Sequence, residues 1–126
     1  MTDRKARILY IEDNADNRGL VKRILEVEGY TVIGVPDAKS GLAEAIAHPP
    51  DLILMDINLP EIDGYTATAQ LRATPGLEKI KIVALTANVL RGDREKTVAA
   101  GCDGYIQKPL DVDQLPQQIA HFLGAE

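Results

Sequence analysis

Residues 52–56 read Leu-Ile-Leu-Met-Asp, a short apolar run, Leu52–Met55, that ends at a carboxylate. Similar short runs, rich in β-branched residues, occur at Arg7–Ile11, Thr31–Val35, Lys81–Leu85 and Gly104–Ile106. Runs of this kind are typical of strands that are buried on both faces. Longer stretches with apolar residues at helical spacing separate them, and this alternation predicts five βα units around a parallel sheet.

Five helices are predicted between and after these strands. They are expected after Asn14 as far as Gly29, after Asp37 as far as Pro49, over Tyr65–Ala73, over Val89–Ala100, and after Asp111. Asn14 is a good N-cap residue, and glycine and proline end helices. On these helices Leu20, Ile46 and Val112 are counted with the apolar faces.

The composition limits the kind of protein this chain is. Its 126 residues, 45% hydrophobic and 26% charged, predict one globular domain over residues 1–126. The 14 Lys and Arg against 19 Asp and Glu give a net charge of −5, which argues against direct DNA binding. Cys102 is the single cysteine, so no intrachain disulfide is expected. Because neither a membrane span nor a signal peptide is recognisable, we expect a cytoplasmic protein without a membrane partner.

Polar residues stand at the ends of four predicted strands. Glu12 and Asp13 follow the first strand, Asp56 the third, Thr86 the fourth and Lys108 the fifth. In a doubly wound parallel sheet, ligands bind at the carboxyl ends of the strands. We therefore expect these side chains to converge on one cleft.

Carboxylates crowded into one cleft repel one another, so at least one would have a raised pKa unless a cation lies among them. Mg²⁺ prefers oxygen ligands and keeps several waters, which suits these carboxylates and the backbone carbonyl of Asn58. Lys108 adds a positive charge opposite the metal. A carboxylate nucleophile, a metal and a lysine are together the equipment for forming an aspartyl phosphate.

Each of these residues also has a plainer interpretation. An acidic pair after a strand is often part of a solvated loop, Thr86 is a residue type that strands favour, and lysines such as Lys108 are often surface charges. A carboxylate that ends an apolar run, as Asp56 does, either has a partner or has a use. The joint occurrence of suitable residues at four separate strand ends favours a functional site.

Four stretches carry a resemblance to a known family: Ile-Glu-Asp-Asn at 11–14, residues 51–64, Ala-Leu-Thr-Ala at 84–87, and residues 101–109. With them the chain resembles the receiver domain of two-component response regulators, from Ile8 to about Leu123. The resemblance implies a flavodoxin-like α/β fold, a (βα)5 doubly wound five-stranded parallel sheet in the strand order 2-1-3-4-5. A narrower likeness points to stand-alone single-domain regulators of the DivK type and to the receivers of hybrid histidine kinases.

The resemblance also implies a role for each residue at the strand ends. Asp56 is the implied phosphoacceptor, and Lys108 pairs with the phosphoryl group. The implied ligands of Mg²⁺ are Glu12, Asp13, Asp56 and the backbone carbonyl of Asn58. Thr86 is implied as the hydroxyl that bonds a phosphate oxygen, Tyr105 as an aromatic switch, and the Lys108–Pro109 bond as cis.

The implied function is a phosphorylation-switched signalling module of a two-component system or phosphorelay. A histidine kinase or a histidine phosphotransfer protein would phosphorylate Asp56 with Mg²⁺ as cofactor, and the changed surface over Val89–Phe122 would bind a downstream protein. The module is not expected to be an enzyme. It is expected to be a monomer or a phosphorylation-dependent dimer.

Other functions use the same fold. A Mg²⁺-dependent phosphatase would also form an aspartyl phosphate, but such enzymes usually carry a second acid where this chain has Asn58. A flavin or nucleotide binder would have a glycine-rich loop after the first strand, where this chain reads Asp-Asn-Ala-Asp-Asn over residues 13–17. A receiver segment within a hybrid kinase is a further alternative.

Overall fold

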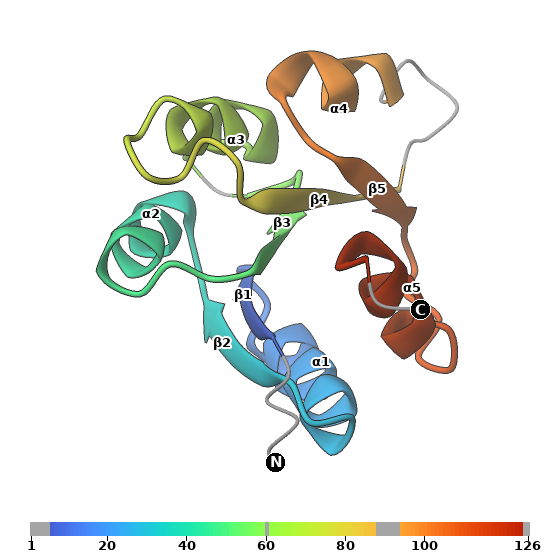
Figure 1. The fold of residues 1–126 in the computed structure, drawn as a ribbon. Helices are drawn as coiled ribbons and strands as arrows, with labels where there is room; N and C mark the ends of the chain where they lie inside the picture. The colour runs from blue at the N-terminus through green and yellow to red at the C-terminus, as the bar shows by residue number, and fades with distance from the viewer. Residues whose placement is uncertain (1–5, 60, 88–93, 125–126) are drawn as a thin grey trace.

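The computed structural model of the chain describes residues 6–59, 61–87 and 94–124 (Figure 1). In these ranges five strands alternate with five helices. The strands are β1 (Arg7–Ile11), β2 (Thr31–Val35), β3 (Leu52–Asp56), β4 (Lys81–Thr86) and β5 (Gly104–Gln107). The helices are α1 (Ala15–Val27), α2 (Ala38–Ala47), α3 (Gly64–Arg72), α4 (Arg94–Ala100) and α5 (Leu115–Phe122). None of these helices is long and apolar enough to cross a bilayer.

The five strands form one parallel sheet in the order β2-β1-β3-β4-β5, which confirms the order that the resemblance implied. In Figure 1, α1 and α5 lie against one face of the sheet, and α2, α3 and α4 lie against the other. This is a doubly wound arrangement. Because every strand runs in the same direction, all five carboxyl ends lie at one edge of the sheet.

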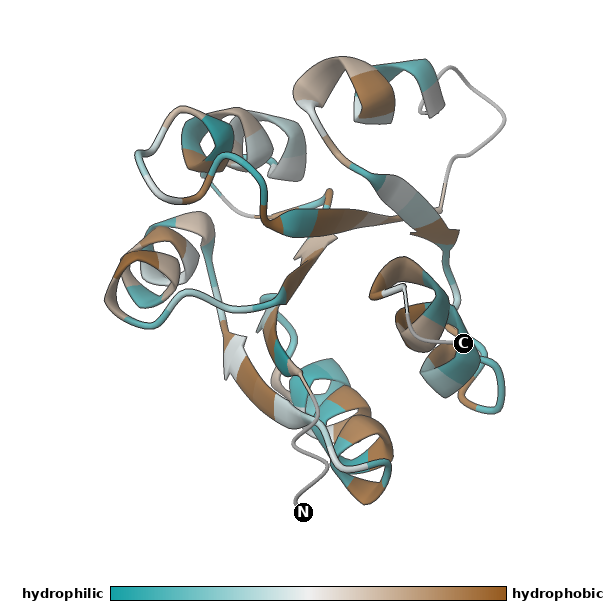
Figure 2. Ribbon diagram, in the orientation of Figure 1, coloured by the Kyte–Doolittle hydropathy of each residue, from teal (hydrophilic) through white to brown (hydrophobic). Residues whose placement is uncertain are grey.

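The hydrophobic core occupies both faces of the sheet, because successive strand residues point to opposite sides. On one face Tyr10 and Leu54 pack with residues of α1 and α5, and on the other Ile11 and Met55 pack with residues of α2 and α3. Figure 2 shows the central strands in the brown of apolar residues between the two layers of helices. Burial on both faces explains why the strand sequences are continuous apolar runs.

Three strands continue one residue farther than the apolar runs predict. β3 includes Asp56, β4 includes Thr86 and β5 includes Gln107. Strand pairing is made by the backbone, so a polar side chain does not end it: Asp56 is paired with Leu85, and Thr86 with Gln107. The polar residues at these strand ends are therefore held by the sheet itself.

Side chains cap the first three helices. Asn14, Asp37 and Asp63 each accept a hydrogen bond from the backbone N–H three residues later, at 2.7 to 2.9 Å. Gly29 follows α1 with a φ of 100°, a conformation that favours glycine. The predicted limits of α1 and the predicted start of α2 are confirmed. α3 begins at Gly64, one residue earlier than predicted, because Asp63 supplies its cap.

The fifth helix differs from its prediction. It begins at Leu115 and not directly after Asp111. The carboxylate of Asp111 instead accepts hydrogen bonds from the backbone N–H groups two and three residues later, which makes a turn. The backbone N–H of Leu115 donates to the carbonyl of Asp111 at 2.9 Å, so this turn leads into α5, and Pro116, which has no N–H, lies in the first turn of the helix. The predicted start of the fourth helix at Val89 and the loop residue Pro60 lie outside the described residues.

Three residues counted with apolar helix faces are exposed: Leu20 by 45%, Ile46 by 56% and Val112 by 43%. Those placements were wrong. A helix that packs on a sheet buries a narrow stripe, which on α1 consists of Val21 and Leu25, four residues apart. Leu20 and Ile46 stand one position from a buried residue and so point about 100° around the helix, toward solvent, whereas Val112 lies in the turn before α5.

Candidate functional site

Three carboxylates gather at the carboxyl edge of the sheet. Glu12 and Asp13 directly follow β1, and Asp56 is the last residue of the neighbouring β3. Oxygens from the three side chains lie within 4.8 Å of one another. Glu12 and Asp56 are each only 2% exposed, whereas Asp13 is open to solvent. The predicted convergence of the acidic strand ends is confirmed.

Lys108 faces this acidic cluster of Glu12, Asp13 and Asp56. Its Nζ lies 2.7 Å from Oδ1 of Asp56, and the Lys108 side chain is 25% exposed. The same oxygen accepts a hydrogen bond of 3.1 Å from the backbone N–H of Asn58. The backbone N–H of Lys108 donates to the carbonyl of Thr86 at 2.8 Å, which ties the turn after β5 to the end of β4. The Lys108–Pro109 bond is cis, as the resemblance implied.

Thr86 and Tyr105 lie on one face of the sheet. Thr86 ends β4 and is 2% exposed, and Tyr105 is a half-buried residue of β5. Tyr105 is paired with Ala84, two residues before Thr86, so the two side chains project to the same side. That side is the one covered by α3 and α4 (Figure 1).

Burial is the main reason that the pKa of Glu12 is raised above its ordinary value, and the nearby charge of Asp56 raises it further. The backbone N–H of Asn14 and the charge of Lys108 act in the opposite direction. Burial therefore contributes more to this shift than the crowding of carboxylates does.

These residues fit a hard divalent cation. Carboxylate oxygens are the ligands that Mg²⁺ prefers, and opposite ligands of an octahedral Mg²⁺ lie about 4.2 Å apart. The oxygens of the three carboxylates lie up to 4.8 Å apart, which is close to this distance between opposite ligands. A carboxylate too far away to bind the ion directly can bind it through a water molecule. A cation at this place would lie beside the oxygens of Asp56, opposite Lys108.

Comparison with known proteins identifies the family. Residues 8–120 match the sequence model of the response regulator receiver domain. The chain belongs to this family. Two relatives of this receiver domain are the polar-differentiation response regulators DivK of Brucella anthropi and Brucella ovis. Each is 38% identical over 117 residues, which cover 93% of this chain and 95% of the relative.

Solved receiver structures agree with this assignment. The receiver domain of the sensor histidine kinase PA1611 from Pseudomonas aeruginosa is 38% identical, with a TM-score of 0.86 over 95% of this chain and 98% of that one. A magnesium ion is coordinated in its active site cleft. The chemotaxis protein CheY4 of Vibrio cholerae is 25% identical, with a TM-score of 0.88 over 93% and 98%. Membership of two-component signalling, predicted from the sequence, is thus confirmed.

Two residues that support the acidic cluster of this receiver domain escaped the sequence analysis. The hydroxyl of Tyr10 donates to Oε1 of Glu12 at 3.1 Å, and burial with the charge of Glu12 raises the pKa of Tyr10, so the hydroxyl stays a donor. The guanidinium of Arg18 donates to the backbone carbonyl of Glu12 at 2.7 Å. The spacing of Tyr10 and Glu12, two residues apart in an extended segment, is the signal that could have revealed the first contact.

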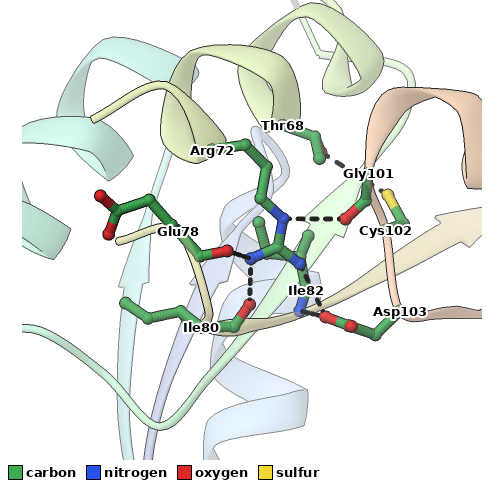
Figure 3. Close-up of polar contacts among 8 residues, drawn as sticks. All are labelled: Thr68, Arg72, Glu78, Ile80, Ile82, Gly101, Cys102 and Asp103. Atoms are coloured by element: carbon green, nitrogen blue, oxygen red, sulfur yellow. Dashed lines mark hydrogen bonds and ion pairs between the residues drawn. The ribbon is translucent and has the colours of Figure 1, made fainter. Parts of the chain in front are cut away.

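Arg72, at the end of α3, makes a separate network of polar contacts away from the acidic cluster (Figure 3). Its guanidinium donates to the carbonyls of Glu78, Ile80 and Gly101 and to the carboxylate of Asp103, the last at 2.7 Å. The same Asp103 oxygen accepts the backbone N–H of Ile82 at 2.8 Å. Arg72 thus joins α3 to the start of β4 and to the turn that leads into β5. Arg72 and Asp103 are 31 positions apart in the chain, so no local sequence pattern predicts their contact.

Proposed function

We propose that Asp56 of this receiver domain accepts a phosphoryl group from a histidine kinase or a histidine phosphotransfer protein. One contact carries the proposal: the ammonium of Lys108 lies 2.7 Å from Oδ1 of Asp56, at the strand edge where two further carboxylates gather. A buried carboxylate with a lysine beside it is a nucleophile in surroundings that can neutralise added negative charge.

The transfer exchanges one bond for another. An oxygen of Asp56 attacks the phosphorus of a phosphohistidine, the new O–P bond forms as the N–P bond breaks, and the electron pair leaves with the imidazole nitrogen. Lys108 then faces phosphoryl oxygens that carry roughly −1.5 to −2 charge.

The acidic cluster and the backbone carbonyl of Asn58 are the proposed ligands of Mg²⁺, by analogy with the magnesium of the Pseudomonas receiver. When bound, Mg²⁺ supplies charge neutralisation for the phosphoryl oxygens. The backbone of Asn58 lies beside Asp56, because its N–H donates to Oδ1 of that residue. Metal ligation by these residues is part of the proposal.

Thr86 and Tyr105 form the proposed switch. The Thr86 hydroxyl would bond a phosphoryl oxygen, and Tyr105, on the same face of the sheet, would change position with it. Tyr105 belongs to β5, which leads into α5, so the change would reach the surface over Val89–Phe122. That surface is the proposed contact for a downstream protein.

Phosphorylation by a small acyl phosphate in the presence of Mg²⁺ tests the proposal. We expect one phosphoryl group per chain, seen by intact mass and released by hydroxylamine. Asp56→Asn should abolish it, whereas Asp113→Asn, which changes an exposed acid in the turn before α5, should leave it unchanged. An equal label on the Asp56→Asn chain would reject Asp56 as the acceptor.

The same experiment addresses the enzymatic alternative. A signalling module that is not an enzyme shows no multiple turnover on a phosphomonoester. Sustained release of phosphate from such an ester, lost in Asp56→Asn, would favour the phosphatase.

Assembly and location complete the proposal. We propose a monomer that dimerises, if at all, on phosphorylation, and that acts in the cytoplasm without binding DNA directly. The net charge of −5 supports the absence of direct DNA binding, and the single cysteine, which excludes an intrachain disulfide, supports a reducing compartment. Sedimentation before and after phosphorylation measures the assembly, and a gel-shift assay measures binding to DNA.

A further inference from the structure

Tyr10 is a core tyrosine whose hydroxyl reaches the acidic cluster. It lies in β1, is 1% exposed, and belongs to the core that packs against α1 and α5. Its hydroxyl donates a hydrogen bond of 3.1 Å to Oε1 of Glu12. Because residues two apart in an extended chain point to the same side, the strand itself brings this donor and acceptor together.

Glu12 is held at both carboxylate oxygens. Oε1 accepts from Tyr10, and Oε2 accepts from the backbone N–H of Asn14 at 3.1 Å. Beside Tyr10 in the sheet lies Gly34 of β2, where the side chain of Arg18 packs on its way to the carbonyl of Glu12. Two donors therefore hold the Glu12 carboxylate, while Arg18 holds the backbone carbonyl of the same residue.

The hydroxyl is the part of Tyr10 that packing does not require. A phenylalanine would fill the same part of the core, and burying a hydroxyl is unfavourable unless it is hydrogen-bonded. Here the bond that satisfies the hydroxyl goes to a carboxylate of the acidic cluster. The tyrosine thus connects the packed core to the charged site.

We propose that Tyr10 is a positioning residue for the cation site: by fixing Oε1 of Glu12, it sets how tightly the acidic cluster holds Mg²⁺. This inference rests on the proposed function, in which Glu12 is one of the ligands. Each carboxylate oxygen of Glu12 accepts one hydrogen bond and can accept a second. A water molecule bound to the Mg²⁺ ion could donate that second hydrogen bond. Removal of a hydrogen-bond partner of a metal ligand typically weakens metal affinity by about 10–100-fold.

Titration of the full chain with MgCl₂, followed by amide NMR shifts, tests the inference. Tyr10→Phe keeps the ring and removes the hydroxyl, and we expect the Kd for Mg²⁺ to rise about tenfold. Tyr30→Phe is the matched control. Tyr30 belongs to the same core and is 8% exposed, but it precedes β2 and so lies at the opposite edge of the sheet from the acidic cluster. The Kd of the Tyr30→Phe variant for Mg²⁺ should therefore equal that of the wild type.

A double-mutant cycle separates positioning from packing. If Tyr10 acts through Glu12, then Tyr10→Phe changes the Kd by less than about twofold in a Glu12→Gln background. An undiminished tenfold effect in that background, or an unchanged Kd for Tyr10→Phe alone, would overturn the inference. A wild-type chain that does not respond to MgCl₂ would instead overturn the proposed cation site itself, so the two failures are distinguishable. Urea unfolding verifies that each variant is folded.

Discussion

Replacement of Gly64 by alanine is expected to damage both the stability of the fold and the geometry of Asp56. Gly64 is the first residue of α3, and its N–H donates to the carbonyl of Ile57 at 3.0 Å. A Cβ atom there would lie 2.5 Å from the carbonyl oxygen of Asp56 and 2.8 Å from Cα of Ile57. Both are backbone atoms, so no side-chain rotation relieves the clash, and either α3 or the end of β3 must move.

The size of the effect follows from these contacts. Overpacking costs about 1–3 kcal/mol, and a clash with backbone belongs in the upper part of that range, about 2–3 kcal/mol. An unfolding entropy of about 2.1 cal/mol/K per residue over 126 residues converts this into a Tm lowered by about 8–11 °C. Because a shift of a reacting atom by about 1 Å costs about 100-fold in rate, phosphorylation of Asp56 should slow at least tenfold.

Differential scanning calorimetry and the acyl phosphate assay measure the two effects. Gly19→Ala is the matched control, because Gly19 is exposed within α1 and a Cβ there would meet nothing within 4 Å. Alanine in an open helical position stabilises by about 0.5–1 kcal/mol, so this control should melt about 2–4 °C higher and be phosphorylated normally. A Gly64→Ala chain as stable as the wild type would refute the steric reasoning.

Three further changes have defined outcomes. Arg72→Met removes four hydrogen bonds and should lower the free energy of unfolding in urea by about 2–4 kcal/mol; a loss below about 1 kcal/mol contradicts this. Lys108→Met removes the ammonium that faces Asp56, so we expect the free energy of unfolding in EDTA to fall by about 2–3 kcal/mol and Mg²⁺ to restore part of that loss. If Mg²⁺ leaves the stability of the variant unchanged, the cation does not bind beside Asp56. The pKa of Glu12 is raised in the folded state, so the native chain keeps that proton to higher pH than the unfolded chain does. Stability in EDTA should therefore fall as pH rises above about 4.5, and the fall should shrink in Glu12→Gln; identical pH profiles of the two chains would exclude Glu12 as the cause.

The strands were predictable because their chemistry is local. An apolar run such as Leu52–Met55 has to be buried on both faces, and five such runs separated by helices leave few arrangements other than a doubly wound sheet. The strand order itself came from the family resemblance. The ends of β3 and β4 were placed one residue short because hydropathy does not report backbone pairing, which continues through Asp56 and Thr86.

The site was predictable only in its charged residues. Glu12, Asp13 and Asp56 end predicted strands, and the parallel sheet brings them to one edge whatever the details of packing. The contacts that orient them depend on side-chain positions in the folded chain: Lys108 reaches Asp56 from 52 residues away, and no periodicity records such a pairing.

Charge links the cation to phosphorylation in this receiver domain. Three carboxylates face one ammonium, so with all four groups ionised the site has two more negative charges than positive ones, which a divalent cation balances. A phosphoryl group on Asp56 replaces one negative charge with roughly −1.5 to −2. Without the cation that addition would increase an existing excess of negative charge, whereas with the cation the excess after phosphorylation is about one charge or less. If the acidic cluster holds the cation as proposed, the same carboxylates make phosphorylation depend on the cation, because the single charge of Lys108 is too small to replace it.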